Sequence, residues 1–159
     1  MINRIQDFKA GLVAVVGSVA LGAVAIAPPA AAGPVLINAE EAQLPTPPGS
    51  APAATRGITR GPKVMLVSPA PGSTVKSPVN LSLKFESFNG AQVNASTLKM
   101  TYVKSPAVDL TDRVKPYVQA SGIEVPQAEL ATGDHVIKVD VTDSEGRTAT
   151  TSFLLKVTK

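Results

Sequence analysis

The chain contains no cysteine and no tryptophan, and its only histidine is His135. Without cysteine neither a disulfide nor a thiolate metal site can form, so packing alone must stabilise the fold. A single histidine with no G-x-S-x-G motif offers no recognisable nucleophile and base for hydrolysis. Aromatic residues make up only 4% of the chain, which disfavours stacking on sugar rings. We therefore expect a protein that is not an enzyme and that binds no cofactor.

Charge is also scarce and evenly mixed. Lysine and arginine number 15 against 12 aspartates and glutamates, which gives a formal net charge of +3. A nucleic-acid partner requires a concentrated basic stripe, and none is present. Arg56, Arg60 and Lys63 form only a loose cationic patch, of the kind that solvates a linker. We expect no nucleic-acid partner.

The N-terminus has the pattern of a secretory signal peptide over residues 1–32. Arg4 and Lys9 precede an apolar run at 10–27, which is followed by two prolines and an alanine triplet ending at Ala32. This order predicts cleavage between Ala32 and Gly33 and a periplasmic or extracellular protein with no membrane contact after cleavage. The alternative is an uncleaved anchor, because a spanning helix needs roughly 20 apolar residues. The glycine- and alanine-rich composition of the run favours cleavage.

Residues 33–62 are rich in proline, alanine, serine and threonine, which predicts a disordered, flexible linker. Within it, the apolar residues 35–37 either pair with a sheet edge or simply form the mature terminus. From residue 63 onward the composition changes to short valine-, leucine- and threonine-rich runs separated by proline, glycine and asparagine. The sequence therefore divides into a signal peptide, a linker and one domain at 63–159.

The pattern of residues 63–159 predicts an all-β fold, an antiparallel β-sandwich of immunoglobulin-like type. In the run at 79–85, apolar and polar residues alternate, which places four apolar side chains on one face. Asn89-Gly90 is typical of a tight turn. The expected strands are 63–67, 79–85, 97–103, 123–125, 135–142 and 147–158.

One short helix is expected between the middle strands. Leu110, Val114, Tyr117 and Val118 recur at helical spacing, with Thr111 as the expected cap and Gly122 as the expected end. The last two strands form a hairpin whose turn spans residues 143–146. Aspartate first and glycine fourth fit a type I turn, because the aspartate side chain accepts the backbone N–H two residues on.

Two stretches resemble known families. Residues 133–147, Gly-Asp-His-Val-Ile-Lys-Val-Asp-Val-Thr-Asp-Ser-Glu-Gly-Arg, followed by Phe-Leu-Leu-Lys-Val at 153–157, resemble the last hairpin of bacterial immunoglobulin-like domains. Residues 66–75, Leu-Val-Ser-Pro-Ala-Pro-Gly-Ser-Thr-Val, look like the same superfamily and also like the start of periplasmic copper-resistance C-type proteins. The resemblance covers about residues 63–159. It implies the sandwich fold but no single function, since this fold carries many.

The copper-resistance resemblance implies a Cu(II) site built from an N-terminal histidine with further histidine and aspartate ligands. Here the expected N-terminus is Gly33 and the only imidazole is His135, whose place at the start of a strand favours a structural role. Asp140, Asp143 and Glu145 lie close in sequence and offer oxygen ligands for calcium. The turn at 143–146 needs no metal, however, and Asp140 should point away from it. We expect no metal site, with these four residues as the candidates if one exists.

These observations favour an exported, non-catalytic module that binds a protein or cell-envelope component through a strand edge or its end loops. The candidate edges are residues 99–103 and the last strand. The candidate end-loop surfaces are residues 87–94 and 109–119. The alternative is a periplasmic protein that carries copper or calcium, and a third option is a passive spacer. The sequence does not fix the oligomeric state.

Overall fold

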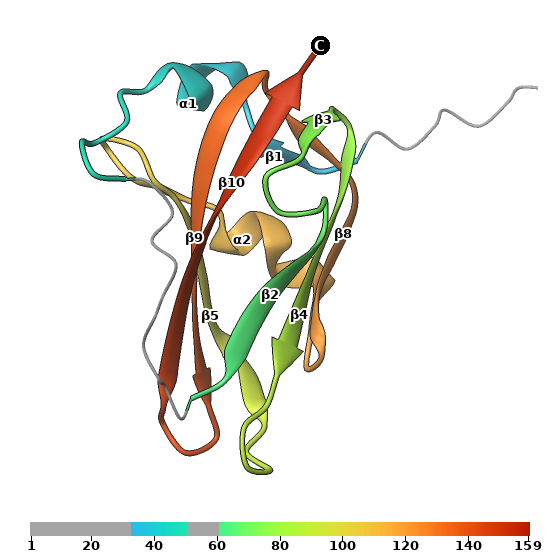
Figure 1. Cartoon of the computed structure of the whole chain (residues 1–159), viewed down its shortest axis with the longest axis vertical. Coiled ribbons are helices and arrows are strands. Elements are labelled where there is room, and N and C mark those ends of the chain that lie inside the picture. Colours follow the sequence, from blue (N-terminus) through green and yellow to red (C-terminus); the bar gives the residue numbers. More distant parts are fainter. Residues whose placement is uncertain (1–32, 51–60) are drawn as a thin grey trace, which may run out of the picture. The chain divides into compact units, whose positions relative to one another are not determined.

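The computed structural model of the protein describes residues 33–50 and 61–159 (Figure 1). The expected signal peptide at 1–32 and residues 51–60 of the expected linker lie outside the described residues. Along the chain the described elements are β1 (Val35–Ile37), α1 (Ala39–Gln43), β2 (Lys63–Ser68), β3 (Thr74–Lys76), β4 (Val79–Glu86), β5 (Val93–Tyr102), β6 (Val108–Asp109), α2 (Thr111–Val114), the 3₁₀ turn η1 (Lys115–Tyr117), β7 (Val118–Gln119), β8 (Gly122–Leu130), β9 (Gly133–Asp143) and β10 (Thr148–Thr158).

The strands form two sheets that pack face to face as a β-sandwich, which confirms the expected fold class. The first sheet has the order β1-β8-β4-β2, with β7 also paired to β8, and the second has the order β3-β10-β9-β5-β6. Most pairs are antiparallel, but β1 pairs with β8 and β3 pairs with β10 in parallel. The fold is therefore a mixed sandwich with a parallel pair on one edge of each sheet.

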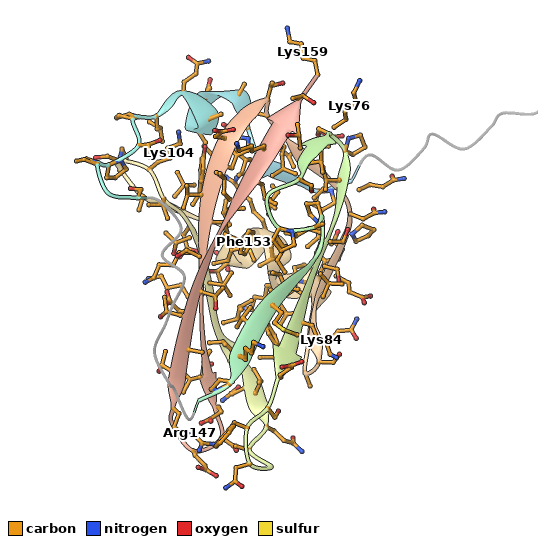
Figure 2. The ribbon with its side chains drawn as sticks, viewed as in Figure 1. Lys76, Lys84, Lys104, Arg147, Phe153 and Lys159 are labelled. Atoms are coloured by element: carbon orange, nitrogen blue, oxygen red, sulfur yellow. The ribbon has the colours of Figure 1, made fainter. Side chains whose placement is uncertain are left out.

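The core lies between the sheets because each long strand alternates apolar and polar residues. Along β4 the burial pattern is strictly alternate, and its four apolar residues are all buried, as the sequence predicts. Phe153 of β10 lies near the centre of the view, whereas Lys84 and Lys159 extend outwards (Figure 2). At ~25 cal/mol per Å², burial of these apolar faces is the main stabilising contribution to the domain.

The chain passes from one sheet to the other at a proline-rich crossing between β2 and β3. β2 pairs with β4 in one sheet, and β3, which follows it along the chain, pairs with β10 in the other. Pro69 and Pro71 lie between them and have no backbone N–H to donate to a ladder, which ends β2. Gly72 has φ +78°, a conformation that glycine adopts without strain. This crossing ties both sheets together at one edge.

The hairpin of β9 and β10 agrees closely with the sequence-based expectation. Its strands pair in continuous register from Thr142↔Thr148 to Gly133↔Val157. In the turn, the Asp143 Oδ1 atom accepts a hydrogen bond from the backbone N–H of Glu145 at 2.9 Å, and Gly146 has φ +78°. Both features of the predicted turn are therefore confirmed.

The helical segment is where expected, but its ends are different. Leu110 and Val114 are fully buried, which confirms the predicted apolar face. Thr111 does not cap the helix with its side chain; instead the Asp109 carboxylate accepts from the Thr111 N–H at 2.8 Å. Gly122 does not end the helix either. It belongs to β8, where an added Cβ would lie 2.0 Å from the Leu83 carbonyl oxygen, so strand packing rather than helix termination requires glycine there.

The strand after the helix is much longer than the predicted 123–125. Proline at 126 ends a strand in the usual sequence rules, yet β8 continues through it to Leu130. The continuation depends on a bulge, because the register shifts between Leu81↔Val125 and Val79↔Ala128. Gln127 takes φ +48° in this bulge, and its N–H donates to the Asn80 side chain at 2.9 Å. The hydrogen bond to the Asn80 side chain therefore takes the place of a backbone hydrogen bond between β8 and β4.

The expectation of a flexible linker over residues 33–62 is wrong for its first part. Leu36 and Ile37 of β1 are 0% and 1% exposed and belong to the core. The N–H of Ala131 donates to the Ile37 carbonyl at 3.0 Å, so β1 extends the sheet beside β8. Burying two large aliphatic side chains outweighs the entropic preference of a proline-rich stretch for disorder. The domain thus includes residues 33–50 as well as 61–159.

No helix within residues 33–50 or 61–159 has the length and apolarity needed to cross a bilayer.

Candidate functional site

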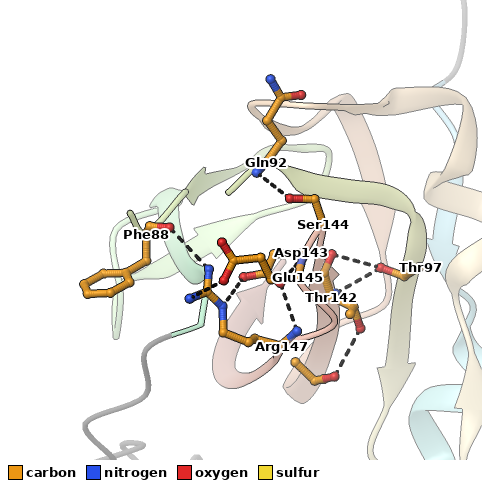
Figure 3. A network of polar contacts seen from close by, with 9 residues as sticks. Phe88, Gln92, Thr97, Thr142, Asp143, Ser144, Glu145 and Arg147 are labelled. Carbon is orange, nitrogen blue, oxygen red and sulfur yellow. Dashed lines mark hydrogen bonds and ion pairs between the residues drawn. The ribbon is translucent and has the colours of Figure 1, made fainter. Parts of the chain in front are cut away.

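Two loops far apart in the sequence meet at one end of the sandwich and form what we call the loop end: residues 87–92, between β4 and β5, and the 143–147 turn, between β9 and β10 (Figure 3). They are joined by a reciprocal pair of hydrogen bonds. The Ser144 N–H donates to the Gln92 carbonyl at 2.8 Å, and the Gln92 N–H donates to the Ser144 Oγ atom at 3.2 Å. The two loops therefore form one continuous surface.

Asp143 anchors this surface. Its side chain is 1% exposed, and its Oδ2 atom accepts from Arg147 Nε at 2.7 Å. Its Oδ1 atom accepts from the backbone N–H of Glu145 and of Arg147, each at 2.9 Å. Burial alone would raise the pKa of Asp143, but the hydrogen bonds from Arg147 and Glu145 outweigh burial and lower the pKa. The carboxylate is thus ionised, and both of its oxygens accept hydrogen bonds that hold the turn and Arg147 in place.

Arg147 carries the contact across to the other loop. Its Nη1 atom lies 2.9 Å from Glu145 Oε2, and its Nη2 atom donates to the Phe88 carbonyl at 3.4 Å. The guanidinium carbon lies 6.0 Å from the centre of the Phe88 ring, within the range of a cation–π contact. Phe88 itself is 49% exposed. The arrangement holds a half-exposed aromatic ring beside a fixed cation.

Threonine contacts extend the network onto β5. The Thr142 N–H donates to the Thr97 Oγ1 atom at 2.9 Å, and the Thr142 and Thr148 hydroxyls lie 3.1 Å apart. The Thr97 hydroxyl also donates to the Asn94 carbonyl at 2.7 Å. These bonds span the bulge in β5, where the register shifts between Asn94 and Lys99. They fix the base of the loop end on the second sheet.

His135 lies apart from the loop end, in the interior. Its Nε2 atom is 2.6 Å from the Ala131 carbonyl and its Nδ1 atom is 2.8 Å from the Tyr102 hydroxyl. Because a carbonyl only accepts, the neutral ring donates from Nε2 and accepts at Nδ1. Burial lowers the pKa of His135 despite the favourable Ala131 carbonyl, and burial also raises the pKa of Tyr102 to about 12. Both ring nitrogens are committed to internal hydrogen bonds.

The three candidate carboxylates are divided between two places. Asp143 and Glu145 both face Arg147, whereas Asp140 pairs with Lys138 at 3.0 Å and accepts from the Thr150 hydroxyl at 2.5 Å. Each carboxylate therefore already has a cationic partner. Within residues 33–50 and 61–159, no group of three or more histidines, aspartates and glutamates could hold a metal ion.

The predicted strand edge at 99–103 is largely covered. β6 pairs with Thr101 and Tyr102, and the Leu110 N–H donates to the Met100 carbonyl at 2.8 Å. The last strand is covered at its end by β3, which pairs with Lys156–Thr158. Strand addition is thus hindered at residues 100–102 and at 156–158. Of the expected end-loop surfaces, the loop at 87–94 joins the polar network of the loop end, whereas Arg113 of the surface at 109–119 belongs to a second network.

A second network, which the sequence reasoning missed, surrounds residues 34–46, called here the N-terminal segment. The Glu41 carboxylate accepts hydrogen bonds from both terminal nitrogens of the Arg113 guanidinium, from Nη2 at 2.6 Å and from Nη1 at 2.8 Å. The Nη1 atom of Arg113 also donates to the Leu36 carbonyl at 2.7 Å. The Arg113 hydrogen bonds lower the pKa of Glu41. Lys104 donates to the Ala42 carbonyl and the Thr46 hydroxyl. The spacing Asn38-x-x-Glu41, which forms a capping box, is the signal that indicates α1 in the sequence.

The fold and these networks define a β-sandwich domain with a structured loop end and an ordered N-terminal segment. No protein-family model matches the chain, and no curated protein matches it. Among solved structures, the chain is similar to CopC from Methylosinus trichosporium OB3b, with 22% sequence identity over 60% of this chain and 93% of that chain. The TM-score is 0.41. A likeness at this level transfers neither a site nor an activity, so the functional argument rests on the chain's own residues.

Proposed function

We propose that the protein is an exported, non-catalytic binding module whose loop end recognises a protein partner in the cell envelope. The observation that carries this proposal is the Phe88–Arg147 pair, a half-exposed ring beside a cation that a buried carboxylate fixes in place. Aromatic residues and arginine are enriched at protein interfaces and supply most of their strongly contributing contacts. The export pattern of residues 1–32 supports an envelope location.

The chemistry of the surface supports a protein rather than a small-molecule ligand. Among the described residues, Phe88 is the single exposed aromatic, and the other large exposed apolar residues are Val35 and Val67. A partner that covers Phe88 would also meet the Glu145 carboxylate, whose side chain is 53% exposed. One apolar anchor with a charged rim is typical of the centre and border of a protein interface.

Preorganisation makes such a surface effective. Binding costs about 0.5–1.5 kcal/mol for each flexible side chain that becomes ordered. Arg147 is already held by Asp143 and Glu145, and the loop that carries Phe88 is hydrogen-bonded to the facing turn. Little of this ordering cost remains to be met on binding.

The proposal is tested by capture of envelope proteins with two variants that are matched in exposure. Phe88→Ala removes the anchor, whereas Val67→Ala removes an apolar side chain that is 54% exposed on β2. We expect the immobilised wild type and Val67→Ala to retain the same envelope protein and Phe88→Ala to lose most of it. Equal retention by all three folded proteins would exclude the loop end as the binding surface.

The competing function, carriage of copper or calcium, gives a different result in a melting experiment. A ligand that binds only the folded state raises its stability by about 2.7 kcal/mol at a hundredfold excess over its Kd. Because His135 and the three carboxylates are already paired, we expect no rise with Cu(II), Zn(II) or Ca(II). A metal-specific rise that Asp143→Ala or His135→Ala removes would instead support the carrier function.

A further inference from the structure

The N-terminal segment occupies a groove on the rest of the domain. One side of the groove is the edge of β8, where the Glu129 N–H donates to the Pro34 carbonyl and the Ala131 N–H donates to the Ile37 carbonyl, both at 3.0 Å. Arg113 reaches over the segment from α2 to the Leu36 carbonyl and the Glu41 carboxylate. The groove thus recognises an extended apolar pair followed by a capped helical turn with an acidic residue.

The segment is held entirely by contacts that a separate chain could also make. Its helix α1 has no buried residues, and the hydrogen bonds within the segment are local ones: those of the Asn38–Glu41 capping box and the backbone bonds from Ala42 and Leu44. Its buried side chains, Leu36 and Ile37, pack into the core of the rest of the domain. The covalent connection from Thr46 to Gly61 is the stretch 47–60. At up to ~3.5 Å per residue, these 14 residues span at most roughly 50 Å, which sets how far the segment of one copy can reach.

We propose that a second copy of this chain can supply the N-terminal segment, so that two copies exchange residues 34–46 and form a dimer. Charge complementarity fits this occupant, because each copy carries both the Glu41 carboxylate and the Arg113 cation that pairs with it, so a second copy offers the same contacts as the chain's own segment. Reciprocal exchange satisfies both grooves and closes the assembly with twofold symmetry. In a dilute solution the chain's own segment fills the groove, because its tether gives it a high effective concentration. The exchanged dimer forms as copies become concentrated.

Charge reversal at the ion pair separates exchange from folding within one chain. Glu41→Arg places two cations together within one copy, and Arg113→Glu places two carboxylates together. When the two variants exchange segments, the introduced arginine of one chain meets the introduced glutamate of the other, and the native Glu41 meets the native Arg113. Each variant is produced as the full chain with a tag of different mass. We expect native mass spectrometry of the equimolar mixture to show a mixed dimer at least tenfold more abundant than the dimers of either variant alone.

The double variant Glu41→Arg/Arg113→Glu is the matched control, because it restores the pair within one chain and should remain monomeric at the dilution used for the mixture. A mixture that contains only monomers overturns the proposal. So does a dimer that forms equally in either variant alone, since another surface would then be responsible. If a single variant does not fold, wild-type chains with light and heavy isotopes are mixed at millimolar concentration. Mixed-mass wild-type dimers that do not form between the wild type and the double variant, where exchange would place like charges together, support exchange, and the absence of mixed-mass wild-type dimers excludes it.

Discussion

The loop end and the N-terminal segment are each organised by one arginine and one carboxylate, but the sequence separation of the partners is very different. Arg147 and Asp143 are four residues apart within one turn, whereas Arg113 and Glu41 are 72 residues apart. The first pair requires only the turn between β9 and β10. The second requires that the N-terminal segment lies against α2 of the folded domain. The pair that is close in sequence shapes the loop end, whereas the pair that is distant in sequence joins the N-terminal segment to the rest of the domain.

Replacement of Leu36 should have the largest effect on stability. Leu36 is fully buried, so Leu36→Ala removes apolar contacts and leaves a cavity in the core. We expect a loss of about 2–5 kcal/mol in the free energy of unfolding, measured by urea denaturation. Val35→Ala, at a neighbouring residue that is 51% exposed, should change it by less than about 0.5 kcal/mol. Equal effects of the two variants would show that β1 is not docked in solution.

Removal of the Glu41 charge should have an intermediate effect. Glu41→Gln keeps the size of the side chain but loses the charge that pairs with Arg113. Charged hydrogen bonds contribute about 1.5–3 kcal/mol, and partial exposure of Arg113 reduces this, so we expect a loss of roughly 1 kcal/mol. The pKa of Glu41 is lowered in the folded state, so the pair's contribution is present above the ordinary pKa of glutamate, about 4.3.

The contribution of Glu41 should therefore be lost as the pH falls through the lowered pKa. Denaturation of wild type and Glu41→Gln at pH 7 and at pH 3 measures the difference in each condition. We expect the two proteins to differ clearly at pH 7 and to converge in acid. A constant difference at both values would mean that the charge of Glu41 does not stabilise the fold.

The stability of the fold should also depend on pH through His135. Its pKa is lowered by burial, so the unfolded chain binds the proton more readily than the folded one. Stability should thus be level above the ordinary histidine pKa of about 6.5 and decline as the pH falls below it. We expect Tm to decrease between pH 7 and pH 5 in the wild type. The His135→Gln variant should be less stable than the wild type at pH 7, and its Tm should change little between pH 7 and pH 5. If its Tm decreases as much as that of the wild type, other titrating groups cause the decrease.

The same contrast between local and distant contacts explains what the sequence could predict. The alternation at 79–85 and the Asp143–Gly146 turn are local patterns, and both are as expected. The docking of Leu36 and Ile37 depends on the free edge of β8, more than 90 residues away in the sequence, which no local pattern shows. Proline and alanine around these residues indicated disorder because composition reports local preference only. The continuation of β8 through Pro126 likewise depends on Asn80, a residue of another strand.

The candidate site was predictable in part for the same reason. The loop at 87–94 and the turn could each be recognised from their own residues, including the hydrogen bond that Asp143 accepts. That the two lie together, and that Arg147 rests against Phe88, follows from the pairing of β5 with β9. Sequence reasoning considered Asp143 and Glu145, together with Asp140, as possible calcium ligands, although it expected no metal site. In the structure the cation they face is Arg147.

The smallest effect on stability is expected for Phe88, and it gives the sharpest contrast with the N-terminal segment. The Phe88 ring is half exposed, and the loop is held by backbone bonds and by Arg147, so Phe88→Ala should change the free energy of unfolding by no more than about 0.5 kcal/mol. Phe85, three residues earlier in β4, is 6% exposed, and Phe85→Ala should cost about 3–5 kcal/mol. Urea denaturation of both variants measures the difference. If Phe88→Ala destabilises the fold as much as Phe85→Ala does, the ring is part of the core and cannot serve as an exposed anchor. If it leaves stability unchanged, the ring is available to a partner, and any loss of binding in that variant reports on recognition rather than on folding.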